Sequence, residues 1–235
     1  MAEAVDRVLG WAREKRPMPV RLVNAYSIAL GNERGDYGAI LRGEGVNFPD
    51  GKPVAAAAGW LSGHRARQIR GPELFERVLD AGQTERVRHY LYGTTPETLQ
   101  KLQETLKQRF PDLVIAGAGA PDFAPVPELA SDEVAERIRS TRPDLVWVGL
   151  GTPKQDFVAV ELARKIGVPA LGVGAAFDFS AGTVPAAPSF LRHVGLEWSY
   201  RLAKEPRRLW RRYLIGNSQF IALVVRDLLA ARRIR

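Results

Sequence analysis

Two polar residues follow the first two apolar stretches of the chain, and their side chains could do acid–base chemistry. Asn24 ends the stretch PVRLVN, and Asp50 stands in the turn PDGK directly after VNF. Both stretches are predicted strands, and the carboxyl ends of parallel strands form the edge of a sheet at which such folds bind ligands. A carboxylate there could take a proton from an attacking hydroxyl group. Asp-Gly pairs and Asn are also ordinary turn residues, so a purely structural role stays open.

Glycines follow or end four further predicted strands. Glycine lets backbone N–H groups approach a phosphate, and the N-terminus of a following helix adds a favourable dipole. The pattern favours nucleotide binding in general, although the stretch GAGAPD departs from the dinucleotide fingerprint and no P-loop is present. The alternative is that the turns need glycine for their backbone geometry alone. The glycines are Gly93, Gly117, Gly119, Gly149, Gly151, Gly172 and Gly174.

A strand–helix–strand unit in the centre of the chain carries two more candidates. Its strands, LVWV and ALGV, are short apolar runs typical of a parallel sheet that is buried on both faces. Thr152 is predicted to cap a helix that starts at Pro153, with Gln155 as the capping-box partner and Gly167 as the stop signal. Gln155 could instead contact a ligand. Asp178, after the second strand, could orient a sugar or only cap a loop.

A third group of candidates lies near the C-terminus. Plotted with the period of an α-helix, four arginines fall on one side of a predicted helix and aromatic and aliphatic residues fall on the other. Such a helix lies on an anionic membrane or packs with its arginines over a phosphate, unless the basic face is merely solvated. The arginines are Arg207, Arg208, Arg211 and Arg212, and the opposite side holds Leu209, Trp210, Tyr213 and Leu214.

These candidates need a scaffold in which strands and helices alternate. Alternation over this length predicts an α/β fold, a doubly wound (Rossmann-like) parallel sheet with helices on both faces, plus a basic C-terminal helical appendage. The loop-like stretch GTVPAAPS marks a boundary, which gives a domain over 1–195 and an appendage over 196–235. Strands are predicted near 19–24, 46–48, 68–71, 89–93, 113–119, 145–148 and 170–173, and helices near 2–16, 26–43, 53–62, 72–82, 95–110, 131–140 and 153–166.

Composition limits the class of protein. The chain has 235 residues, 46% of them hydrophobic, which is enough for one sizeable core. It has no cysteine, so disulfides, thiolate nucleophiles and zinc–cysteine sites are excluded. The charged N-terminal stretch lacks the apolar segment of a signal peptide, and the run FIALVV is too short to span a bilayer. We therefore expect a soluble or peripheral protein.

Positive charge is concentrated at one end of the chain. Residues 196–235 hold ten basic and three acidic residues, so this part has a net charge of +7 out of +8 for the whole chain. The asymmetry indicates a basic module on a nearly neutral body. Its partner could be nucleic acid, an anionic lipid surface or a phosphorylated substrate.

Four motifs together resemble the WecG/TagA/CpsF family, glycosyltransferase family 26: NFPDG, GLGTPKQD, GVGAAFDFSAG and GLEWSYRLAKEPRRLWRRY. The resemblance runs from about Val20 to Tyr213 and is densest after Leu145. It implies a metal-independent, inverting glycosyltransferase without a cofactor. The enzyme would move an N-acetylhexosamine, often N-acetylmannosamine, from a UDP-sugar to a polyprenyl-diphosphate-linked sugar. It would work at the cytoplasmic face of the membrane, in cell-surface polysaccharide or teichoic acid biosynthesis.

The resemblance also implies roles for the candidate residues. Asp50 would be the base, and arginines would stabilise the charge on the departing UDP by charge-assisted bonds, in keeping with the lack of a DxD motif. The appendage would contact the membrane and close the active site. The catalytic candidates are Asp50, Arg208 and Arg211. The substrate-binding candidates are Asn24, Gly51, Gly93, Gly117, Gly149, Gly151, Gln155, Gly174, Asp178, Arg201 and Arg212.

Several positions depart from the family pattern. Leu22 stands where members usually carry Thr, and Ala186 stands where they usually carry Arg. Lys52 replaces an apolar residue, and Asp156 replaces the commoner Glu. The loss of the Thr and the Arg removes polar contacts from the expected pocket, which leaves the donor sugar open.

Three other functions remain as alternatives to the transferase. The chain could be a degenerate member that binds a UDP-sugar without turnover. It could be a basic nucleic-acid-binding protein, although the neutral body and the aromatic-aliphatic helix face argue against nucleic acid as the partner. It could be a dehydrogenase, against which the missing dinucleotide fingerprint counts. Homo-oligomerisation is left open by the sequence.

Overall fold

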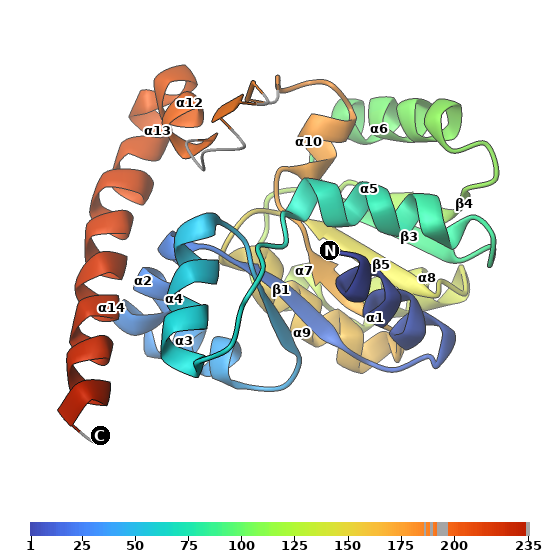
Figure 1. Cartoon of the computed structure of the whole chain (residues 1–235). Helices are drawn as coiled ribbons and strands as arrows, with labels where there is room; N and C mark the ends of the chain where they lie inside the picture. The colour runs from blue at the N-terminus through green and yellow to red at the C-terminus, as the bar shows by residue number, and fades with distance from the viewer. Residues whose placement is uncertain (186, 189, 192–196, 234–235) are drawn as a thin grey trace.

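The computed structural model describes residues 1–185, 187, 188, 190, 191 and 197–233. Among these residues, six parallel strands form one sheet in the order β2-β1-β6-β5-β3-β4, with helices on both sides (Figure 1). The predicted α/β class is therefore confirmed, as is a helical C-terminal part. The strands are β1 (Pro19–Val23), β2 (Val46–Pro49), β3 (Arg88–Gly93), β4 (Val114–Gly119), β5 (Leu145–Gly149) and β6 (Ala170–Gly172).

The central strands are buried on both faces, because alternate side chains enter two different cores. Leu91 and Trp147 pack beneath α1, α5, α6 and α10, whereas Tyr90 and Val146 pack beneath α7, α8 and α9. These helices are α1 (Ala2–Arg13), α5 (Gly71–Gly82), α6 (Pro96–Arg109), α7 (Val126–Leu129), α8 (Asp132–Ser140), α9 (Lys154–Ile166) and α10 (Ala176–Ser180). The continuous apolar runs of the sequence reflect this double burial.

Two predictions on the first third of the chain are wrong. The helix expected over 26–43 is two helices, α2 (Ala25–Glu33) and α3 (Gly35–Arg42), because Arg34 has an extended backbone. The two helices meet at a close contact, where a Cβ on Gly38 would lie 2.3 Å from the carbonyl oxygen of Gly31. The strand expected at 68–71 does not form, since this stretch makes only one strand-like bond, from the N–H of Ile69 to the oxygen of Pro49.

The C-terminal part is helical and packs on the body. It comprises α12 (Glu197–Lys204), α13 (Pro206–Trp210), the π-helix η1 (Arg211–Ile215) and α14 (Gly216–Arg233). Figure 1 shows α14 beside α2 and α4 (Lys52–Ser62), and Phe220 of α14 is buried against Val54 and Ala57 of α4. No helix within the described ranges combines the length and the apolar character needed to cross a membrane.

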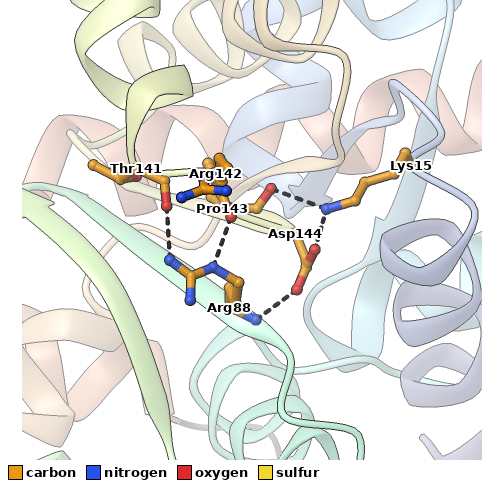
Figure 2. Close-up of polar contacts among 6 residues, drawn as sticks. All are labelled: Lys15, Arg88, Thr141, Arg142, Pro143 and Asp144. Atoms are coloured by element: carbon orange, nitrogen blue, oxygen red, sulfur yellow. Dashed lines mark hydrogen bonds and ion pairs between the residues drawn. The ribbon is translucent and has the colours of Figure 1, made fainter.

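The amino-terminal ends of the central strands are held by an ion pair and by hydrogen bonds to the backbone (Figure 2). Asp144, just before β5, forms an ion pair with Lys15 and accepts a 2.8 Å hydrogen bond from the backbone N–H of Arg88. The guanidinium group of Arg88 donates to the carbonyl oxygens of Arg142 and Thr141, at 2.8 and 2.9 Å. These bonds fix β3 against β5 at the sheet edge opposite to the candidate residues, which we call the amino edge.

Candidate active site

Asn24 and Asp50 lie together where β1 and β2 end, as predicted. Asn24 is the N-cap of α2, and its Oδ1 accepts a 3.1 Å hydrogen bond from the backbone N–H of Ser27. The backbone N–H of Asp50 donates to the oxygen of Val23 at 2.8 Å, which ties the turn after β2 to β1. Gly51 follows with φ of 116°, a conformation that favours glycine, and leads into α4. Asp50 and Gly51 therefore do form a turn, and this turn holds the Asp50 carboxylate at this edge of the sheet.

Two adjoining hollows open at this carboxyl edge of the sheet. The smaller, of about 140 Å³, lies between the body and the C-terminal helices, and the larger, of about 300 Å³, lies over the ends of β5 and β6. Asn24, Asp50, Arg201 and Arg212 line both hollows. The smaller also has aromatic and apolar lining from Tyr26, Pro53, Val54, Trp198 and Tyr213, together with the polar side chains of Lys52, Gln68 and Asn217. A carboxylate and two guanidinium groups thus stand where the two spaces meet.

The floor of the larger hollow comes from the central strand–helix–strand unit. Gly149, Gly151, Gln155 and Gly174 line it, so these predicted residues are brought together. The capping prediction is wrong: α9 begins at Lys154, after Pro153 as N-cap. The side chain of Gln155, only 3% exposed, instead accepts a 3.1 Å bond from the N–H of Gly151. Gln155 therefore fixes the loop that faces the hollow.

Asp178 lines the larger hollow from α10, whereas two predicted glycines lie outside both hollows. Oγ1 of Thr94 donates to Oδ1 of Asp178 at 3.4 Å. Gly93 packs against the next strand, since a Cβ there would lie 2.5 Å from the oxygen of Gly149. Gly117 packs against the ring of Tyr90 and lines a separate hollow near the outer strand β4. Gly93 and Gly117 thus allow close packing of the sheet.

Arg211 and Arg212 lie in different surroundings, so the prediction that the arginines share one face is wrong for this pair. The i→i+5 bonding of η1 changes the angle between successive side chains relative to an α-helix. Arg212 therefore turns inward, with its guanidinium 5.1 Å from the ring centre of Tyr26, whereas Arg211 is exposed and lies over Trp210. The side chain of Arg208 lies outside the described residues.

Arg212 carries the strongest sign of a missing anionic partner. Its Nε is buried and has no hydrogen-bond partner among the residues that the structure describes. Burial lowers the pKa of Arg212, and the nearby charge of Arg201 acts in the same direction, against the opposing effects of Tyr213, Tyr26 and Asp50. Two like charges placed together in a partly closed space favour the binding of a multiply charged anion.

A buried ionic network lies behind this site. Tyr37 donates a 2.6 Å bond to Asp156 Oδ2, and the fully buried Arg21 donates from Nε to the side chain of Asn47 at 2.7 Å. Burial raises the pKa of Asp156 to about 6, against the stabilising effects of Tyr37 and Arg21. Arg21, Asn47 and Asp156 lie three, three and one residues from Asn24, Asp50 and Gln155. The network therefore joins the segments that bear the site.

Sequence reasoning missed other residues of this site. Arg70 and Glu205 line the larger hollow, and Tyr26, Trp198, Tyr213 and Asn217 line the smaller one. The signal for Arg70 is that it ends a stretch rich in basic residues directly before the helix that starts at Gly71. The aromatic residues could have been found only from the contact between the C-terminal part and α2.

No group of three His, Asp or Glu side chains that could hold a metal ion occurs in the described ranges.

Nearly the whole chain matches one family of known proteins. Residues 1–234 match the glycosyl transferase WecG/TagA/CpsF family. Relatives named N-acetylglucosaminyldiphosphoundecaprenol N-acetyl-beta-D-mannosaminyltransferase include those of Bacillus spizizenii, 33% identical over 79% of this chain and 70% of the relative, and of Bacillus subtilis, 29% identical over 76% and 68%. The relative of Staphylococcus aureus is 28% identical over 78% of this chain and 68% of its own length.

Proposed function

Since this chain belongs to the WecG/TagA/CpsF family and is thus a glycosyltransferase, we propose that it transfers an N-acetylmannosamine-type sugar from a UDP-sugar to a lipid-linked acceptor. The acceptor is a sugar carried on a polyprenyl diphosphate, as the names of the relatives state for those proteins. The product serves cell-surface polysaccharide or teichoic acid biosynthesis. Family membership gives no support to the nucleic-acid-binding and dehydrogenase alternatives.

One observation carries the proposal: Asp50 stands at the junction of two hollows of different character, beside Arg201 and Arg212. A transferase needs two substrate sites that meet at the reacting atoms. We assign the donor to the larger hollow, whose glycines and arginines suit a diphosphate. We assign the acceptor sugar to the smaller hollow, whose aromatic rings suit the apolar face of a sugar ring.

The chemistry follows from this placement. Asp50 accepts the proton of the acceptor hydroxyl group, and the oxygen attacks the anomeric carbon of the donor. The bond from that carbon to the diphosphate oxygen breaks, and UDP leaves with the electron pair. Arg201 and Arg212 stabilise the negative charge that develops on the diphosphate, so no metal is required. A single displacement of this kind inverts the anomeric configuration.

The C-terminal part gives the enzyme a surface for the membrane. Alongside its net positive charge, it exposes apolar side chains, among them Ile221, Val225 and Leu229 at four-residue spacing on α14. Basic residues with exposed apolar side chains favour binding to anionic lipid. We therefore propose a peripheral location on the inner, cytoplasmic face of the membrane, where a lipid-linked acceptor is presented.

Binding without turnover is the second candidate. Leu22 lines the larger hollow at the position where the family usually carries Thr, and it brings an apolar side chain to the donor site. Ala186, which stands where the family usually carries Arg, lies outside the described residues. The deciding experiment measures UDP release from UDP-N-acetylmannosamine with a polyprenyl-diphosphate-linked N-acetylglucosamine acceptor, with and without EDTA. Release that survives EDTA supports the transferase, and donor binding without release supports the second candidate.

A further inference from the structure

A second basic region lies in the body of the protein and comprises α4 and the loop that leads to α5. Residues 51–72 contain Lys52, Arg65, Arg67 and Arg70 and not a single Asp or Glu. The net charge of the first 195 residues does not reveal these basic residues, because acidic residues elsewhere in the body bring that charge close to zero. A stretch of this length without an acid is a positive surface wherever its side chains reach solvent.

The two ends of this stretch belong to the active site, and its middle points away from it. Lys52 and Pro53 line the smaller hollow at the start of α4, and Arg70 lines the larger hollow at the other end. α4 has 11 residues, so its far end is about 16 Å from its start. The chain turns there at Gly63, which has the left-handed conformation, and returns to the site without regular structure.

The far end exposes apolar and basic side chains together. Trp60 is 66% exposed and Leu61 is 46% exposed, on the last turn of α4. Arg65 and Arg67 follow in the exposed loop, and neither has a hydrogen-bond or ion-pair partner within the described part of the chain. Trp is the side chain that best suits a membrane–water interface, with basic residues beside it at the level of the headgroups.

The helix α4 lies beside α14, whose exposed side chains we propose to contact the membrane. Both helices start at the smaller hollow, which Lys52 of α4 and Asn217 of α14 line. Further along, Phe220 of α14 packs against Val54 and Ala57 of α4. They therefore run away from the site in the same direction, side by side (Figure 1). The end of α4 therefore lies on the side of the body along which α14 runs, and α14 also exposes apolar side chains.

We propose that residues 60–67 form a second contact with an anionic lipid surface, on the body and separate from the basic C-terminal part. The inference rests on the proposed peripheral membrane location. Its consequence is that the body has two separate contacts with the membrane, one of them at the far end of α4, about 16 Å from the start of α4 beside Asp50.

The absence of cysteine from the sequence permits a direct test. Three full-length proteins each carry one cysteine with an environment-sensitive fluorophore, from Leu61→Cys, Val225→Cys and Lys101→Cys. The Lys101 label lies on α6 and serves as the control. We expect the labels at 61 and 225 to shift to the blue with phosphatidylglycerol vesicles and not with pure phosphatidylcholine, and the label at 101 to stay unchanged.

The outcomes separate the two proposals. A response at 225 without one at 61 overturns this inference and leaves the membrane location intact, whereas no response at either position overturns both. A shift at 61 that depends on protein concentration without vesicles, or that duplex DNA produces equally, also overturns the inference, because the occupant is then a second copy or nucleic acid.

A charge variant gives the second measurement. Arg65→Gln with Arg67→Gln should weaken binding to phosphatidylglycerol vesicles by roughly tenfold, since each basic residue near the surface contributes to the attraction. Lys101→Gln with Lys107→Gln removes the same charge from α6 and should leave binding within about twofold of the unmodified protein. Equal losses in the two double variants would show a general effect of net charge and overturn the inference. UDP binding in solution should be unchanged in both.

Discussion

The two edges of the sheet treat charge in opposite ways. At the amino edge, Asp144 pairs with Lys15 and the guanidinium group of Arg88 donates to two backbone carbonyl oxygens, so each charged side chain has a bonding partner within the chain. At the carboxyl edge, Arg201 and Arg212 approach one another in a shared hollow, and the buried Nε of Arg212 has no partner among the described residues. Charged groups that have partners within the chain contribute to stability, whereas two like charges placed close together indicate a site for an oppositely charged ligand. The following predictions test that contrast.

Asp50→Asn should give the largest effect. It keeps the size of the side chain and much of the turn chemistry, so the fold and UDP-sugar binding should persist. It removes the base, and turnover should fall by roughly 10²–10⁴-fold. Steady-state UDP release and donor titration measure the two properties. Turnover within about threefold of the unmodified enzyme would show that Asp50 is only a turn residue, and Asp178 would be the next carboxylate to test.

Arg212→Ala should come next, and Arg211→Ala is its matched control. Loss of one preformed cationic donor to a developing diphosphate charge should lower kcat by roughly 10²-fold or more. Arg211 is exposed and lies outside both hollows, so its loss should change kcat by less than about threefold. The reverse ranking would support the assignment made from the family resemblance and would contradict the one made from the structure.

Asp156 tests whether an ionisable group buried behind the carboxyl edge makes the stability of the fold depend on pH. Its pKa is raised to about 6 from 3.8, so its contribution to stability is fully present below about pH 4. That contribution is lost as the pH rises through 6 and amounts to about 2–3 kcal/mol. Urea unfolding from pH 4.5 to 7.5 should show this fall, and Asp156→Asn should lack it. Identical pH profiles for the two proteins would exclude Asp156 as the titrating group.

Asp144→Ala at the amino edge should give the smallest effect, and on stability alone. The variant loses a bond to a backbone N–H and a partly exposed ion pair, which together contribute about 1–2 kcal/mol. Thermal unfolding should show the loss, while kcat and KM for UDP-sugar should stay within about twofold. A larger kinetic defect would break the contrast between the two edges.

Local rules predicted much of the fold, because each signal acts within a few residues. The helices predicted near 95–110 and 131–140 form, with Thr95 and Ser131 as their caps, and Gly167 ends α9 in the left-handed conformation. The site was harder to predict from the sequence. Asn24 and Asp50 could be placed because each follows its own strand, whereas the inward turn of Arg212 depends on a π-helix and on packing against Tyr26. The spacing of Gln155 suited a helix cap, but in the structure its side chain accepts a hydrogen bond from Gly151 in the loop before the helix.

The position of β6 in the sheet has a consequence for synthesis of the protein. β1 pairs with β2 on one side and with β6 on the other, yet β6 leaves the ribosome some 150 residues after β1. The edge of β1 that faces β6 therefore has no strand to pair with until most of the body has been translated. Pairing over such a separation is slow and leaves strand edges exposed. The substrate site is thus completed only after β6 and the C-terminal helices that line it have been translated.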